Sequence, residues 1–438
     1  MGKLTDDLNE YIKNTKARFH MPGHNGETLS PVYASAPYDV TELGFNDNLN
    51  CPNGTLKELE ERIAKFSKTK DSLVFTSGTT TAIFVGLGAL RKYSKKIGID
   101  QFSHKSVFEG ARLWDYDVTI IPREYDKEGI AKPITSLDDF LAKNPDIKVI
   151  SLTSPDYLGI CINPSVIKKI KDKGILVFID SAHGAHFKFS TALPNALTNV
   201  AEIVCDSWHK TLPVYTGGSV LQICNDKLDS IANVCRMLRA KLHTTSPSYV
   251  TLSSFDESLY LMQNVAYEDI IKKVAEIKKN NPKFSYLDSD VIDPTKLTIN
   301  VDEDIFISNG IMPETSFGRW TNFIITPFNV DKLPLLEAVL RKAKPIKKVS
   351  NITIPKAPNK LPRKIKPETE VSFINIEDSL GYISATDVGA YPPGVPVLFE
   401  GQKITKSHIN YLLKTRDHSF NLINGQIAVI KKIKKSHN

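Results

Sequence analysis

The stretch that decides the fold is Cys205-Asp-Ser-Trp-His-Lys-Thr211, in which a lysine lies between an apolar run and a turn of small residues. The run Glu202-Ile-Val-Cys205 is predicted to be a buried strand, and Thr216-Gly-Gly-Ser-Val-Leu221 to be a turn that enters another strand. Lys210 therefore lies at a strand end among small polar residues, which is a poor place for a solvated surface lysine. A lysine with little access to water can lose its proton near neutral pH and form a Schiff base with an aldehyde.

A second apolar strand upstream ends in an aspartate, in Gly174-Ile-Leu-Val-Phe-Ile-Asp180. If the two strands are neighbours in a parallel sheet, Asp180 and Lys210 lie at the edge where such sheets bind ligands. A pyridoxal phosphate site requires this pair, because the lysine holds the aldehyde and the carboxylate keeps the ring nitrogen protonated so that the ring can accept electrons. The predicted cofactor is pyridoxal 5'-phosphate.

The phosphate of this cofactor needs an anion site, and Thr76-Ser-Gly-Thr-Thr-Thr81 offers one between an apolar strand and a helix. The free amides at the helix start, with the hydroxyls of Thr79 and Thr80, suit a phosphate. An ordinary Ser/Thr cap is the alternative, and for this segment alone it is favoured. Ser207 and His209, which flank Lys210, add further phosphate donors.

Histidines follow two of the predicted strands. His104 could stack on a planar ring and later donate a proton, and a surface-loop histidine is the alternative. His183 and His186 suggest zinc, but no third ligand lies at a suitable spacing, so no metal is predicted. Ala182 is more informative, because a small residue two positions after Asp180 lets a flat ring lie close.

Composition limits the class of protein. The 438 residues are enough for a large core and two or three domains, and 41% hydrophobic, 24% charged and 9% aromatic residues are typical of a soluble globular protein. No apolar run reaches about 18 residues, so no membrane span is expected. The polar N-terminus and five scattered cysteines without a C-x-x-C pair indicate the cytoplasm.

The net charge of +7 is spread along most of the chain, and the densest basic run is Lys431-Lys-Ile-Lys-Lys-Ser-His-Asn438. Nucleic-acid binding is one interpretation of this tail. A solvated terminus is favoured, because no interleaved aromatic residues or recognised binding motif accompany it. No nucleic-acid partner is therefore predicted.

Strands and helices alternate from Thr55 onward, which is typical of parallel β-α-β units. Apolar strands such as Ile175–Ile179 fit a sheet that is covered on both faces. After about Pro282 the pattern changes, and residues 344–370 are rich in Lys and Pro, as in an extended connector. The predicted fold class is α/β, with an N-terminal arm, a large cofactor-binding domain with a mainly parallel sheet, and a smaller C-terminal α+β domain. Their predicted bounds are 1–45, 46–281 and 282–438.

Seven ordered blocks of this sequence together resemble the ornithine/lysine/arginine decarboxylase family of pyridoxal-phosphate enzymes, which have the aspartate-aminotransferase (type I) fold. The blocks are Arg18-Phe-His-Met-Pro-Gly-His24, Thr41-Glu-Leu43, Ser77-Gly-Thr-Thr80, His104-Lys-Ser106, Asp180-Ser-Ala-His-Gly-Ala-His-Phe187, Ser207-Trp-His-Lys-Thr-Leu212 and Thr244-Thr-Ser-Pro-Ser248. A further run, Tyr391-Pro-Pro-Gly-Val-Pro396, is similar to the family's C-terminal signature.

The resemblance implies α-decarboxylation of a basic amino acid to CO2 and a polyamine-pathway amine, with Lys210, Asp180 and His104 as catalytic residues. Arginine is favoured over lysine or ornithine, because compact members of the family resemble biosynthetic arginine decarboxylases. The ring would lie between His104 and Ala182. The residues implied to hold the phosphate are Gly78, Thr79, Thr80, Ser207 and His209.

Two other functions stay open. Arg319 and Arg341 lie in the region where an aminotransferase carries its carboxylate clamp, so a pyridoxal-phosphate aminotransferase is the enzymatic alternative. The second is a non-catalytic regulator with this fold, against which the intact pair of Lys210 and Asp180 speaks. A decarboxylase for a cationic substrate needs carboxylates or carbonyls at the far end of its pocket. The candidates are Glu42, Asp47, Asp156 and Glu257.

The fold type resembled is dimeric, with active sites at the subunit interface, so a homodimer is expected. The irregular segment Arg18–Asn53 is then expected to contribute to the neighbouring site. Two departures stand out. Thr216-Gly217 stands where relatives often have Thr-Gln, which puts a loop contact in doubt. The chain is also compact and lacks the extra N-terminal domain of the large inducible enzymes, which argues against their ring-shaped assemblies.

Overall fold

The computed structural model describes residues 2–42, 46–224, 229–348, 351–391 and 393–431. Leu43, Pro392 and the basic tail after Lys431 took part in the sequence predictions and lie outside the described residues.

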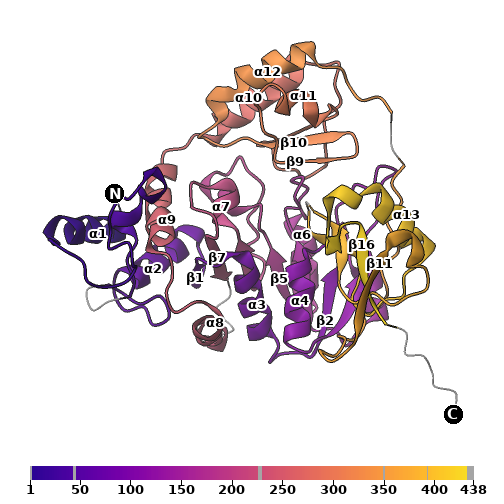
Figure 1. The fold of residues 1–438 in the computed structure, drawn as a ribbon, viewed down its shortest axis with the longest axis horizontal. Helices are drawn as coiled ribbons and strands as arrows, with labels where there is room; N and C mark the ends of the chain where they lie inside the picture. The colour runs from indigo at the N-terminus through magenta and orange to yellow at the C-terminus, as the bar shows by residue number, and fades with distance from the viewer. Residues whose placement is uncertain (1, 43–45, 225–228, 349–350, 392, 432–438) are drawn as a thin grey trace.

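The centre of the fold is a mainly parallel sheet (Figure 1). Within the described chain it has seven strands in the order β1-β7-β6-β5-β4-β2-β3. Only β7 runs antiparallel to its neighbours, β1 and β6, and the other adjacent pairs are parallel. The predicted fold class is confirmed. In sheet order the strands are β1 (Asp71–Phe75), β7 (Ser219–Ile223), β6 (Ile203–Asp206), β5 (Leu176–Asp180), β4 (Val149–Thr153), β2 (Lys96–Asp100) and β3 (Asp117–Ile121).

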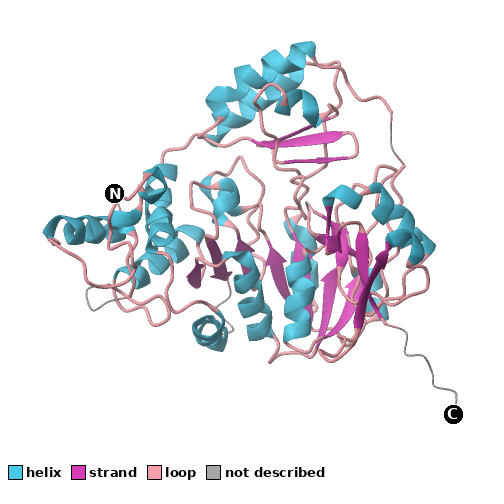
Figure 2. Ribbon diagram, viewed as in Figure 1, coloured by secondary structure: helices cyan, strands magenta, loops and turns pink. Residues whose placement is uncertain are grey.

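Helices cover both faces of the sheet, which explains why its strands are apolar throughout (Figure 2). Alternate residues of β5 face opposite ways: Phe178 packs in the core cluster that includes α3, α4 and α8, whereas Val177 and Ile179 pack in the one that includes α5 and α6. Gly86 of α3 fits tightly against the sheet, since a Cβ there would lie 2.5 Å from the Phe178 ring. These helices are α3 (Gly78–Leu90), α4 (Lys105–Leu113), α5 (Asp138–Lys143), α6 (Pro164–Asp172) and α8 (Asp229–Leu242).

Two groups of elements that precede residue 343 lie beside the sheet. The N-terminal helices pack near the β1 edge, and a three-stranded antiparallel sheet in the order β8-β10-β9 lies above the main sheet with three helices (Figure 1). The first group is α1 (Lys3–Asn14), α2 (Thr55–Ser67) and α9 (Tyr249–Met262). The second is α10 (Tyr267–Asn280), β8 (Lys296–Ile299), α11 (Glu303–Ile307), β9 (Thr315–Phe317), β10 (Trp320–Ile324) and α12 (Leu333–Lys342). The domain division at 281/282 stays a prediction, and α10, which precedes it, lies in the second group.

The Lys/Pro-rich connector runs along the edge strand β3. The Ile120 amide donates to the Asn359 carbonyl at 2.9 Å, and the Leu361 amide donates to the Val118 carbonyl at 3.1 Å. These bonds cover backbone groups of β3 that would otherwise be an open sheet edge.

A C-terminal module follows the connector and packs beside β2 and β3 (Figure 1). Arg112 of α4 attaches it through two hydrogen bonds, at 2.5 and 2.8 Å, to the carboxylate of Asp387, and both side chains are buried. The module contains β11 (Val371–Asn375), β12 (Val388–Ala390), β13 (Val395–Leu398), α13 (Lys406–Lys414), β14 (Ser419–Phe420), β15 (Leu422–Ile423) and β16 (Gln426–Ile430). Among all described helices, none is both long and apolar enough to span a membrane.

We predict that Arg112→Ala lowers the free energy of unfolding by about 3 kcal/mol, because it leaves the Asp387 carboxylate buried without its cation. Urea unfolding of the full chain measures this. Lys168→Ala is the matched control, since its ion pair with Asp172 is exposed and its loss changes stability by at most about 0.5 kcal/mol. Equal stability of the two variants would show that the buried pair does not hold the module.

Candidate active site

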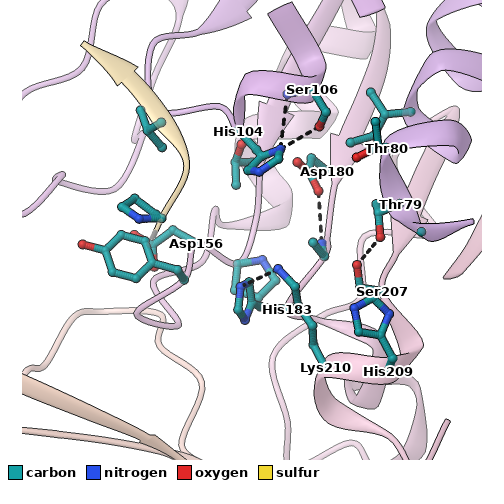
Figure 3. Close-up of a pocket in the computed structure, with 18 of the residues that line it drawn as sticks. Thr79, Thr80, His104, Ser106, Asp156, Asp180, His183, Ser207, His209 and Lys210 are labelled. Carbon is teal, nitrogen blue, oxygen red and sulfur yellow. Dashed lines mark hydrogen bonds between the residues drawn. The ribbon is translucent and has the colours of Figure 1, made fainter. Parts of the chain in front are cut away.

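A cavity of about 320 Å³ opens at the carboxyl ends of the parallel strands, where β4, β5 and β6 end at Thr153, Asp180 and Asp206. All the predicted site residues line it (Figure 3). They are Gly78, Thr79, Thr80, His104, Asp180, Ala182, Ser207, His209 and Lys210. The parallel topology therefore brings together residues from four separate loops, as the pattern of strand ends predicted.

The start of α3 forms one end of the cavity and is built to receive an anion. Ser77 stands at the cap position but makes no side-chain cap hydrogen bond, so the ordinary cap expected as the alternative is not formed. Gly78 has a left-handed φ of +82°, and a Cβ on it would meet no atom within 4 Å. Gly78 thus leaves open space beside the start of α3, which fits the phosphate group of the predicted cofactor.

Gly217 packs against the α3 end of the cavity. Its geometry explains why this chain has Thr216-Gly217 where relatives often have Thr-Gln. Its φ is +95°, its carbonyl accepts from the Gly78 amide at 2.7 Å, and a Cβ on it would lie 2.7 Å from the Thr76 carbonyl oxygen. A glutamine here would meet both a strained backbone conformation and a steric clash. The glycine is therefore required by the local backbone of this chain.

The remaining phosphate candidates come from the turn after β6. The hydroxyls of Thr79 and Ser207 are hydrogen-bonded to each other across the cavity (Figure 3). Nδ1 of His209 donates to the Gly218 carbonyl at 2.8 Å, so Nε2 carries a hydrogen only when the ring is protonated. Burial lowers the pKa of His209, and a bound dianion would raise that pKa again. His209 can therefore donate to a phosphate once the anion is present.

Asp180 lies deep in the cavity and is 2% exposed. Its Oδ1 accepts from the Ala182 amide at 3.2 Å. Burial raises the pKa of Asp180 to about 6, against the opposing effect of the Lys210 cation. A cationic ring nitrogen placed next to this carboxylate would keep it ionised, so its environment fits the predicted cofactor.

His104 is held by contacts that sequence reasoning missed. Its Nδ1 lies 2.8 Å from the Ser106 hydroxyl, and the Lys105 amide donates to the carbonyl of Gly394 at 2.8 Å. A Cβ on Gly394 would lie 2.7 Å from the His104 ring, so the C-terminal module forms the wall behind this histidine. Burial, with a smaller effect of Lys210, lowers the pKa of His104 to about 4. His104 is therefore neutral at pH 7 and is a poor proton donor in this state.

Lys210 points into the cavity from α7 (Trp208–Thr211), and its Nζ lies 3.1 Å from Nε2 of His183 (Figure 3). Part of the Lys210 side chain is exposed to solvent in the cavity, while protein atoms of the cavity walls surround the rest of it. Burial lowers the pKa of Lys210, and Asp180 and Glu314 oppose this. The free amine needed for bonding to an aldehyde is therefore easier to form than at an ordinary surface lysine.

The four candidates for the substrate tail lie in different places. Asp156 lines the cavity with Lys210. Asp47 accepts from amides at the start of α2, Glu257 lines a separate groove with Thr5, and Glu42 accepts from the Thr41 hydroxyl. Sequence reasoning missed Glu314, which lines an adjoining cavity that also contains Lys210. No spacing signal links Glu314 to Lys210, because they are a hundred residues apart, one just before β9 and the other in α7.

The arginines that suggested an aminotransferase lie elsewhere. Arg319 makes hydrogen bonds of 2.7 and 2.9 Å to both oxygens of Glu128, and Arg341 lies on α12. No arginine is among the described residues that line the cavity. His186 pairs with Asp293 at 3.1 Å, and within the described chain no group of three or more His, Cys, Asp or Glu side chains could hold a metal ion.

Two family models match this chain, and both describe the same family of enzymes. The family model described as Orn/Lys/Arg decarboxylase, major domain, matches residues 3–317, and the one described as Orn/Lys/Arg decarboxylase, C-terminal domain, matches residues 353–422. An uncharacterized protein, YaaO, of Bacillus subtilis is 26% identical over 92% of both chains. The arginine decarboxylase of Halalkalibacterium halodurans is 28% identical over 92% of this chain and 91% of its own.

Solved structures share the same fold. The lysine decarboxylase of Francisella novicida superposes with a TM-score of 0.75 at 19% identity, covering 98% of this chain and 81% of that one. At this identity the likeness concerns the fold, including the C-terminal module.

We predict that Asp180→Asn stabilises the cofactor-free protein at pH 8 by about 2–3 kcal/mol. An acid with a raised folded-state pKa contributes stability below its unfolded pKa of about 4 and loses it as the pH rises through about 6. Urea unfolding from pH 4 to pH 8 should show the variant's advantage appearing across this window. The exposed Asp172→Asn is the control. An advantage that does not depend on pH would contradict the assigned cause.

Proposed function

Because the chain belongs to the Orn/Lys/Arg decarboxylase family and is a pyridoxal-phosphate-dependent amino-acid decarboxylase, we propose that its preferred substrate is arginine rather than lysine or ornithine. The relative from Halalkalibacterium halodurans, matched over nine tenths of both chains, is named an arginine decarboxylase. The products would be CO2 and an amine of the polyamine pathway.

The observation that carries this proposal is that Lys210 and Asp180 line the same cavity. Asp180 ends β5, and Lys210 follows the end of β6, the adjacent parallel strand. Lys210 would hold the aldehyde carbon, and Asp180 would accept from the protonated ring nitrogen. His104 and Ala182 would lie against the two faces of the ring. The phosphate would be held at the start of α3, where Gly78 leaves room for it, by Thr79, Thr80, Ser207 and His209. The bound cofactor supplies an aldehyde for the substrate amine and a ring that accepts the electrons left by the departing CO2.

The residues of the chain then have two further tasks. After substrate binding, the Lys210 amine is free to hold a proton and deliver it to the substrate Cα. His104, with a pKa of about 4, is neutral near pH 7 and its single ring N–H is a very weak acid, so we assign protonation to Nζ of Lys210. Asp180 lowers the barrier by keeping a positive charge on the ring nitrogen in a site with little water.

Asp156 is our first candidate for the cationic tail of the substrate. Its Oδ1 accepts from the amides of Leu158 and Ile160 at 2.9 Å, while its buried Oδ2 has no hydrogen-bond partner among the described residues. Burial raises the pKa of Asp156 to about 6, so a cation at Oδ2 would relieve an unfavourable charge. Glu314 is the second candidate, because it acts electrostatically on Lys210.

We also propose a homodimer with active sites at the subunit interface. Five large hydrophobic side chains of the N-terminal segment are exposed, and Phe19 and Val32 are 98% and 89% exposed. The other three are Met21, Leu29 and Tyr33. A second copy would remove this surface from water. A cytoplasmic location is supported by the five cysteines, all of which are free thiols.

The first test is a product assay with holoenzyme and each basic amino acid. We expect CO2 and amine in a one-to-one ratio, with the highest kcat/KM for arginine. Lys210→Ala should abolish turnover and remove the borohydride-sensitive absorbance near 420 nm, because the amine that bonds the aldehyde is gone. A keto acid without CO2 would indicate transamination, and equal rates for lysine and arginine would refute the proposed preference.

A second test concerns the substrate tail. Asp156→Asn should lower kcat/KM for arginine by about tenfold to a hundredfold, the effect of losing one charge-assisted hydrogen bond. Glu314→Gln tests the second candidate in the same assay, and Glu257→Gln is the control, because Glu257 lines a different groove. If Asp156→Asn matches the control, Asp156 does not bind the tail.

A further inference from the structure

His183 lies between two lysines at the floor of the cavity. Its Nε2 is 3.1 Å from Nζ of Lys210, and its Nδ1 is 3.2 Å from Nζ of Lys296 (Figure 3 shows the Lys210 contact). Lys296 belongs to β8 and is 3% exposed, and His183 is 8% exposed. The decarboxylation steps assigned above use neither residue.

Lys210, His183 and Lys296 cannot all have the protonation states that they would have in water. A neutral imidazole has one N–H and one lone pair, so it accepts from one neighbour and donates to the other. If both lysines were ammonium ions, one contact would place hydrogen against hydrogen. A protonated imidazole between two ammonium ions would be worse still. One of the two lysines must therefore accept a hydrogen bond, and only a neutral amine can accept.

The surroundings indicate that Lys296 is the one that keeps its proton. Its Nζ donates to the Tyr157 carbonyl at 2.5 Å, and the buried carboxylates of Asp293 and Asp156 act on it electrostatically. Burial lowers the pKa of Lys296, and these two carboxylates oppose that effect. Without the Lys296 charge, two buried carboxylates would lose a counter-ion, which is costly. An ammonium at Lys296 has no lone pair and must donate to Nδ1 of His183.

The other charged or titratable neighbours do not change this assignment. Nε2 of His186 lies 3.1 Å from a carboxylate oxygen of Asp293, and Glu314 acts electrostatically on both lysines. Asp180 faces Lys210 and favours its charged form. His104 is neutral near pH 7. Burial, followed by Lys296 and Lys210, lowers the pKa of His183 well below its usual value, so the imidazole stays neutral.

We propose that Lys296 is a positioning residue: it fixes the tautomer of His183 with the N–H at Nε2, and this N–H selects the neutral amine of Lys210. The surplus proton of Lys210 leaves to water through the open mouth of the cavity. The lysine that bonds the aldehyde is thus ready as a free amine before any ligand arrives. The inference rests on the proposed role of Lys210, and it adds the residue that controls its proton.

The experiment measures Lys210 directly in the full-length, cofactor-free chain. Acetic anhydride labels only the neutral amine, and mass spectrometry of the Lys210 peptide gives its labelling rate from pH 6 to pH 10. We expect Lys296→Met to slow labelling at pH 7 by about tenfold, which corresponds to a rise of one unit in the Lys210 pKa. Lys296→Arg, which restores a cationic donor, should recover most of the rate.

A second readout reports the tautomer itself. With 15N-labelled histidine, long-range proton–nitrogen spectra show which ring nitrogen of His183 carries the hydrogen, and His183→Gln identifies the signal. The wild-type chain should have the hydrogen at Nε2, and Lys296→Met should lose this preference. Lys283→Met is the matched control, because Lys283 donates to the backbone carbonyls of Arg341 and Ala343 in the same part of the fold.

Three outcomes would overturn the proposal. A hydrogen at Nδ1 of His183 in the wild-type protein would reverse the direction of the hydrogen bonds from Lys296 to Lys210. This measurement needs no variant to fold. Slower labelling in Lys296→Met with an unchanged His183 tautomer would show that Lys296 acts on Lys210 only through its charge and not through His183. Unchanged labelling would show that the lysines are not coupled. Neither readout uses turnover, so inactive holoenzyme with the predicted tautomer would count against the proposed function alone.

Discussion

The parallel register of β5 and β6 is the constraint on which the rest of the site depends. Asp180, the last residue of β5, pairs with Cys205 of β6, and Lys210 follows five residues later. Because parallel neighbours end at the same edge, this single pairing places a carboxylate and an amine in one cavity without any contact between their side chains. The sheet is covered on both faces by packed helices, and the loops that carry the site residues all leave its strands at this edge.

Buried charge is the second organising feature, and it has opposite effects on neighbouring groups. Burial raises the pKa values of Asp180 and Asp156 to about 6 and lowers that of Lys210. Each shift reflects a buried charge that the cavity walls balance only in part, and each is relieved when a group of opposite charge binds. The cavity is thus organised for a phosphate, a cationic ring and a cationic substrate before any of them is present.

The sequence was sufficient for the parts of the site that lie within a few residues of a strand end. Asp180, Lys210 and the α3 start were predicted because an apolar run followed by small polar residues identifies such an end. Lys296 and Glu314 could not be found in this way. Lys296 lies on β8 of a separate antiparallel sheet and contacts His183 from there, and Glu314 immediately precedes β9 of that sheet. Gly217 was noticed only as a departure, because the clash that requires a glycine involves the carbonyl of Thr76, more than a hundred residues away.

The wall behind His104 has a consequence for the order in which the enzyme is made. Synthesis proceeds from the N-terminus, so Lys210, Asp180 and the phosphate loop leave the ribosome well before Gly394 and Val395, which complete the cavity. A nascent or prematurely terminated chain can carry the reactive lysine but has no backing for the histidine. The last fifth of the polypeptide is therefore required to complete the active site, and a chain released early lacks that part of the cavity.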